Sequence, residues 1–124
     1  MPKTVETSLG KVQIAEEVVA KIAGMAALEC PGLAGMAPRR QVMDRLNEVL
    51  RRENLERGVD VQIGPNGDDV KVGLYIIVQY GVNIYDTAVN VQERVADALN
   101  RYIGMDNTQI HVYVQGVDFG EGNR

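Results

Sequence analysis

The sequence predicts an α/β (α+β) fold, a two-layer sandwich of a small mixed β-sheet with about three helices. Apolar residues recur at helical spacing in residues 15–28, 39–55 and 84–103. Between these segments, apolar and polar residues alternate with the period of two that is typical of strands. Because helices and half-buried strands must cover each other's apolar faces, we expect the helices to pack against one sheet.

The length of 124 residues corresponds to one domain, which we place at residues 5–117 with a flexible tail at 118–124. A net charge of −4 weighs against general nucleic-acid binding, which needs a strong positive field. The N-terminal residues lack the apolar segment of a secretory signal, and the longest apolar run, residues 74–78, is too short to span a membrane. We therefore expect a cytoplasmic protein.

The first elements are an extended piece at residues 5–14 and a helix at residues 15–28. Glu16 and Glu17 suit the positive end of the helix dipole, and Pro31 with Gly32 ends the segment. The expected apolar face of the helix consists of Val18, Ile22, Met25 and Ala26. Its several alanines would let it approach a sheet closely.

A short strand or extended link at residues 33–37 leads to a charged helix at residues 39–55, which Pro38 opens. Residues 59–63 then alternate as a half-buried strand, and the Asn66-Gly67 turn predicts a hairpin to the next strand. That strand, residues 70–80, carries apolar side chains on both faces, which indicates a central strand covered in part on both sides.

The last helix is expected at residues 84–103, with Asn83 as its N-cap and Gly104 as the residue of positive φ that ends it. Its expected buried stripe consists of Ile84, Ala88, Val91, Val95, Leu99 and Tyr102. A final strand at residues 109–117 alternates apolar residues with His111, Tyr113 and Gln115.

A candidate contact surface follows from the alternation in the last two long strands. If the strands are neighbours, one face of the sheet gathers amphipathic and apolar side chains, namely Tyr75, Ile77, His111, Tyr113 and Val117. Aromatic residues with polar tips suit protein interfaces. The alternative is that another part of the chain covers this face.

A second candidate surface is the charged helix. Residues 39–57 hold six arginines against four acidic residues, a local excess of +2, and Arg45 and Arg52 are candidates for partner binding. Such a face could dock an acidic partner, lipid head groups or RNA. Because opposite charges alternate along it, the alternative is a solvated helix with interleaved ion pairs.

The chain contains few residues that could support catalysis or bind a metal. Ser8, Cys30 and His111 are each the only residue of their type, so triads and nitrogen- or sulfur-rich metal sites cannot be assembled. Cys30 follows a helix end, where the negative dipole raises a thiol pKa, and Asp68-Asp69 is typical of a solvated turn. We predict no catalytic residue, cofactor, metal or small-molecule ligand. The Gly32 to Gly35 stretch lacks the basic flanks of an RNA-binding loop.

Three stretches resemble the alkaline shock protein family of Gram-positive bacteria, a general-stress and cell-envelope group. They read LGKVQIAEEVVAKIAGMAALECPGLAGM at residues 9–36, LYIIVQYGVNIYDTAVNVQERV at residues 74–95 and HVYVQGV at residues 111–117. Residues 39–59, RRQVMDRLNEVLRRENLERGV, resemble a short subfamily often encoded beside a dihydroxyacetone-kinase-like or fatty-acid-kinase protein.

This resemblance implies a non-enzymatic cytoplasmic protein, which would reach the membrane only through a separate anchor protein. The first hypothesis is a binding or scaffold module that self-associates or pairs with a related family member, through an exposed strand edge or the face of Tyr75 and Tyr113. The second is an accessory subunit of the neighbouring kinase-like enzyme. The third, an RNA-binding module, is disfavoured by the acidic net charge.

Overall fold

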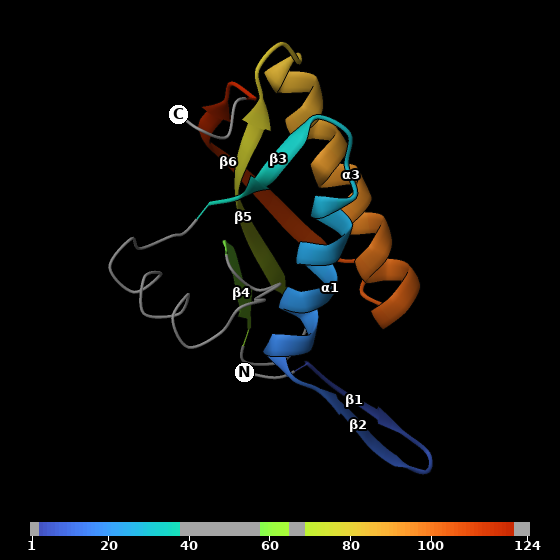
Figure 1. The fold of residues 1–124 in the computed structure, drawn as a ribbon. Coiled ribbons are helices and arrows are strands. Elements are labelled where there is room, and N and C mark those ends of the chain that lie inside the picture. Colours follow the sequence, from blue (N-terminus) through green and yellow to red (C-terminus); the bar gives the residue numbers. More distant parts are fainter. Residues whose placement is uncertain (1–2, 38–57, 65–68, 121–124) are drawn as a thin grey trace, which may run out of the picture.

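Two helices pack on one face of a small mixed β-sheet, as Figure 1 shows. The computed structural model describes residues 3–37, 58–64 and 69–120. The elements follow in the order β1 (Lys3–Thr7), β2 (Gly10–Ile14), α1 (Glu16–Leu28), β3 (Leu33–Met36), β4 (Val59–Ile63), β5 (Val70–Gln79), α3 (Ile84–Ile103) and β6 (Thr108–Asp118). The expected two-layer α+β sandwich is confirmed, while the expected helix at residues 39–55 lies outside the described residues.

The centre of the sheet is β5, which pairs with strands on both of its sides. On one side β3 pairs antiparallel with the C-terminal half of β5, and β4 pairs antiparallel with its N-terminal half. On the other side β6 runs parallel to β5 along its length. Two short strands therefore lie end to end along one edge of the sheet, and the long strand β6 forms the other edge.

The two short strands meet opposite Tyr75. The backbone N–H of Tyr75 donates to the carbonyl of Gly58 at 2.9 Å, and its carbonyl accepts from the N–H of Ala37 at 2.7 Å. Gly58 has a φ of +78°, and a Cβ there would lie 2.5 Å from the carbonyl oxygen of Ala37. Glycine is required at this junction both by the left-handed backbone and by the space available.

The core lies between β5 and the two helices. Alternate residues of β5 point into it, and all of them are at most 2% exposed, namely Val70, Val72, Leu74, Ile76 and Val78. They meet Val91, Val95 and Leu99 of α3, each of which is fully buried. β5 is the central strand that the sequence predicts, because it pairs with strands on both of its sides. The side chains on its other face are exposed or only partly buried.

The buried face of α1 agrees with the expected one only in part, since Ala26 is buried and Ile22 is partly buried. Val18 and Met25 are 45% and 47% exposed, whereas the small residues Ala23 and Ala27 are fully buried. Small side chains allow α1 to lie close to α3 and to the sheet at the same time. Because most positions of this helix are apolar, the spacing alone could not select which of them face inward.

Both ends of α3 are formed as predicted. The side-chain oxygen of Asn83 accepts from the backbone N–H of Asp86 at 2.9 Å, and Gly104 adopts a φ of +84°. The expected buried stripe is wrong at its two ends, where Ile84 and Tyr102 are exposed. Tyr102 lies beside α1 in the wall of an open cavity, which leaves much of its side chain exposed.

The N-terminal piece is a hairpin of two strands, where the sequence predicted a single extended segment. β1 and β2 pair antiparallel with Val5 opposite Val12, in a sheet separate from the main one. Thr7 fixes the turn, because its hydroxyl accepts from the N–H of Leu9 at 3.1 Å. Figure 1 shows this hairpin projecting from the start of α1, away from the two layers.

We predict that Leu99→Ala lowers the free energy of unfolding by about 2–5 kcal/mol, because it leaves a cavity at a fully buried position. Tyr85→Ala, at a position of the same helix that is 76% exposed, is the matched control and should change stability by less than about 0.5 kcal/mol. Urea denaturation followed by circular dichroism measures both. Equal effects of the two substitutions would contradict the assigned core.

We also predict that Gly58→Ala destabilises the protein more than Gly81→Ala does. Both glycines have a left-handed backbone, which costs alanine about 1–2 kcal/mol. Only at Gly58 would the added methyl group also collide with backbone oxygens, since nothing lies within 4 Å of the corresponding position at Gly81. Thermal unfolding of the two variants decides the order, and a less stable Gly81→Ala would contradict the β3–β4 junction described above.

Candidate functional site: the outer face of the sheet

The side of the sheet opposite the helices carries the four candidate residues of β5 and β6. The parallel register places Gly73 beside His111 and Tyr75 beside Tyr113. The two tyrosine rings stack, with their centroids 4.8 Å apart and an angle of 22° between their planes. The two strands are neighbours, which is the condition on which the candidate surface depended, and the structure brings these side chains together.

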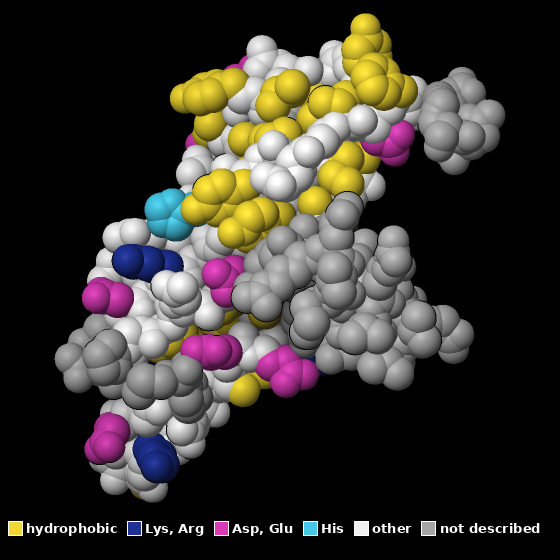
Figure 2. Space-filling model, turned by 90° about the vertical axis from the view of Figure 1, so that its left-hand side faces the viewer, with side chains coloured by type: hydrophobic (Ala, Val, Ile, Leu, Met, Phe, Trp, Pro, Cys, Tyr) yellow, Lys and Arg dark blue, Asp and Glu magenta, His cyan; other side chains and the backbone are white. Residues whose placement is uncertain are grey.

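This outer face is partly open to solvent. Tyr113 is 44% exposed and His111 is exposed, while Tyr75 and Ile77 are partly buried. Figure 2 shows hydrophobic side chains gathered over the upper part of this side of the molecule, with the histidine at their margin and a cationic side chain below it. An aromatic surface with polar groups at its margin is suited to contact with another protein.

A shallow cavity of about 200 Å³ lies beside the tyrosine pair. Polar side chains of both charge signs surround it, including Asp60, Lys71 and His111. Its floor is open because Gly73 has no side chain, and a Cβ there would make an ordinary contact, 3.6 Å from the Tyr113 ring. The cavity has room for a side chain of a partner protein.

Val117 was expected on the same face, and this expectation is wrong. A bulge in β6 shifts the register so that Gly116 lies beside Ile77 and Val117 lies beside Val78, a residue of the core. One extra residue in a strand reverses the alternation of all residues after it. The candidate surface therefore ends at the bulge.

The other two candidate residues, Arg45 and Arg52, lie outside the described residues, so their helix stays a sequence-based prediction. Asp68, between β4 and β5 in the sequence, also lies outside the described residues, so its place in a solvated turn stays a prediction. The antiparallel pairing of these strands agrees with the hairpin expected from the Asn66-Gly67 turn.

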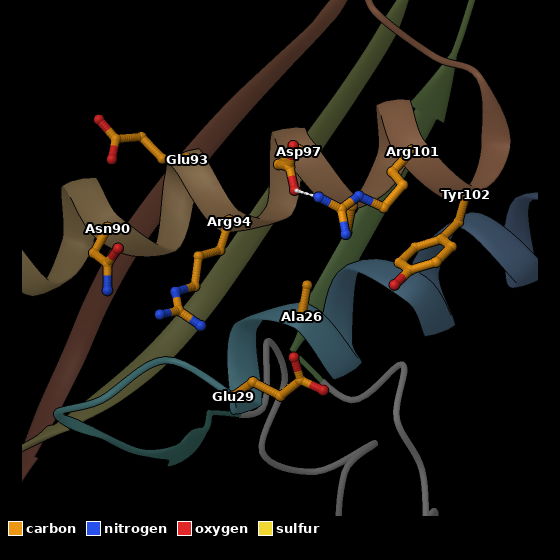
Figure 3. Close-up of a pocket in the computed structure, with 9 residues that line it drawn as sticks. Ala26, Glu29, Asn90, Glu93, Arg94, Asp97, Arg101 and Tyr102 are labelled. Atoms are coloured by element: carbon orange, nitrogen blue, oxygen red, sulfur yellow. Dashed lines mark ion pairs between the residues drawn. The ribbon is translucent and has the colours of Figure 1, made fainter.

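A groove between α1 and α3 was not predicted from the sequence. Two adjoining cavities of about 420 and 260 Å³ share Ala26, Glu29, Ala98 and Tyr102 in their walls. In Figure 3 charged side chains line the rim, and Arg101 forms an exposed ion pair with Asp97 at 3.6 Å. The groove arises from small residues on both helices. Its exposed charges have both signs, so they do not select one class of ligand.

Cys30 lies at the end of α1 in the core and is 4% exposed. Burial raises the pKa of its thiol, an effect that nearby Arg94 partly offsets and Glu29 reinforces. Burial is therefore the main cause of the raised pKa, whereas the sequence alone suggested the helix dipole as the cause. A raised pKa leaves little thiolate at neutral pH, which supports a structural role for Cys30.

No group of three or more potential metal ligands is found in the part of the chain that the structure describes. Among the described helices, none combines the length and the apolar character needed to cross a bilayer. The described residues thus supply a contact surface and a groove as the candidate sites.

Relatives of this chain are known in Gram-positive bacteria. YloU of Bacillus subtilis (strain 168), named an uncharacterized protein, is 43% identical over 111 residues, which are 90% of this chain and 91% of that protein. Uncharacterized protein YqhY of the same organism is 34% identical, with 92% of this chain and 82% of that protein covered. Uncharacterized protein Spy1614 of Streptococcus pyogenes serotype M6 is 32% identical, with 94% and 95% covered.

Among solved structures, a variant of MamM-CTD is similar with a TM-score of 0.49 and 17% sequence identity, over 84% of this chain and 100% of that chain.

The family expected from the three sequence stretches is confirmed. Residues 4–119 match the model of the alkaline shock protein 23 family, which is described by a cell envelope-related function, and this chain therefore belongs to that family.

Proposed function

We propose that this protein is a non-enzymatic binding module that acts in assembly at the cell envelope. It works by associating with a second copy or with a related member of its family, which can be membrane-anchored. The observation that supports the proposal is the outer face of the sheet, where Tyr75 and Tyr113 form a partly exposed stacked pair on the side opposite the helices. Residues 5–117 form the binding unit.

The chemistry of this face supports a protein partner. Tyrosine gives a large contact area at a small cost in conformational entropy and is frequent among residues that dominate binding energies. Beside the pair, Ile77 adds apolar surface, and the polar margin can form hydrogen bonds with a partner. The described residues contain no group of three or more potential metal ligands, and the family description names no catalytic activity.

We predict that Tyr113→Ala reduces partner retention by about tenfold or more, which corresponds to the loss of ~1.4 kcal/mol of binding free energy. The assay is affinity capture of the tagged protein from native lysate, with soluble and membrane fractions kept separate. Tyr113 is partly exposed, so the variant should keep the unfolding free energy of the wild type within about 1 kcal/mol.

Tyr85→Ala is the matched control, because Tyr85 is 76% exposed on α3, in the helical layer. It should retain the same partners as the wild type. Recovery of a family member or of a membrane anchor by the wild type supports the proposal. Recovery of a kinase-like protein alone would favour an accessory role instead, and a strictly monomeric protein that retains no partner would contradict the proposed function.

A further inference from the structure

The two edges of the main sheet differ in how they are protected against further pairing. One edge consists of β3 and β4, which have four and five residues and meet at a junction. The other edge is β6, with 11 residues, and β5 is the only strand that pairs with it within the described ranges. A long edge strand exposes unpaired backbone donors and acceptors, which natural proteins usually protect.

The composition of β6 gives it little protection. Between Thr108 and Val117 the strand contains no lysine, arginine, aspartate, glutamate or proline, the residues that commonly block edge pairing. One backbone acceptor is occupied from outside the sheet, since the side-chain amide of Gln92 donates to the carbonyl of Ile110 at 2.8 Å. The bulge lies toward the C-terminal end, so residues 108–114 form a regular strand.

The core is also incomplete along this edge. In β5 the residues that face the helices are at most 2% exposed, whereas their neighbours in β6 are only partly buried, namely Ile110, Val112 and Val114. These side chains lose the cover that a further strand would provide. A strand added beside β6 would bury them more fully and extend the tyrosine-bearing face.

We propose that this further strand is β6 of a second copy of the same chain, in an antiparallel pair about a two-fold axis. The proposal rests on the self-association proposed above and specifies its contact. Because the strand carries no charge before Asp118, two copies can lie side by side without repulsion between like charges. If residues 108–114 of the two copies pair along their whole length, His111 lies opposite His111 of the other copy, and Gln109 lies opposite Tyr113 of the other copy. The stacked tyrosines of both copies would then share one continuous face.

Disulfide trapping tests this arrangement, because the native Cys30 is buried and new cysteines report on their own surroundings. His111→Cys places a thiol at the predicted two-fold axis, where the Cα atoms of directly opposed residues are about 4.5–5.5 Å apart. Lys71→Cys is the matched control: it lies on the same face, one strand further in. The two copies of residue 71 would be separated sideways by three strand spacings, about 14 Å, and further by an offset along the strands, which is beyond the reach of a disulfide.

Under mild oxidation at equal concentration, we expect His111→Cys to form covalent dimers at least about tenfold faster than Lys71→Cys. Gln109→Cys tests the register, because its two copies would lie four residues apart along the paired strands and should link as slowly as Lys71→Cys. Non-reducing gels and mass spectrometry measure both.

Sedimentation velocity of the untreated wild type separates the possible failures. If the protein dimerises but Lys71→Cys links as fast as His111→Cys, the copies meet face to face; the edge pairing is then wrong, while the proposed function stands. If the protein dimerises and no cysteine in β6 links, the edge pairing is also wrong. If the wild type stays monomeric at all concentrations, the pairing with a second copy is overturned, and lysate capture decides the proposed function by itself.

Discussion

The burial of one face of β5 is the constraint on which the rest of this structure depends. The alternating side chains of this strand make the floor of the core, and α1 and α3 must lie over that floor to keep it from water. Because β5 also pairs on both sides, every other strand of the main sheet takes its register from it. Even the junction of the two short strands is set by one residue, Tyr75, whose backbone bonds to both.

This arrangement gives the protein two unlike sides. On the helical side, small residues such as Ala23 and Ala27 bring the layers together, and the remaining groove is lined by exposed charges of both signs. On the other side the same strands present Tyr75 and Tyr113, which stack on each other. The proposed contact with another protein rests on this tyrosine-bearing side, and the family of the chain is described by a cell envelope-related function.

The sequence was most informative where a local signal has one physical solution. The limits of α3 follow from Asn83 and Gly104, because a side-chain cap and a left-handed terminal residue are local requirements of any helix. Alternation placed Tyr75 and Tyr113 on the less buried faces of their own strands, but only the pairing of β5 with β6 shows that the two residues are neighbours.

Other features depend on interactions that a single sequence does not show. The buried side of α1 was predicted only in part, since apolar spacing could not tell Met25, which is exposed, from Ala23, which packs in the core. The bulge that moves Val117 to the other face leaves no local signal, and neither does the groove between the helices, which needs the relative placement of two distant segments. The turn of the N-terminal hairpin at residues 8–9 was missed because only Gly10 marked it.

We propose that this protein meets its partners with the sheet, through the tyrosine face and the outer edge of β6. Residue-resolved amide hydrogen exchange, recorded by NMR at low and at high protein concentration, tests it most directly. We predict that the amides of β5 are protected at both concentrations, because this strand is paired on both sides. Protection along β6 should alternate at low concentration and become continuous at high concentration. If self-association instead adds protection to α1 and α3 and leaves β6 unchanged, the helical layer is the contact surface, and the proposed contact through the sheet is wrong.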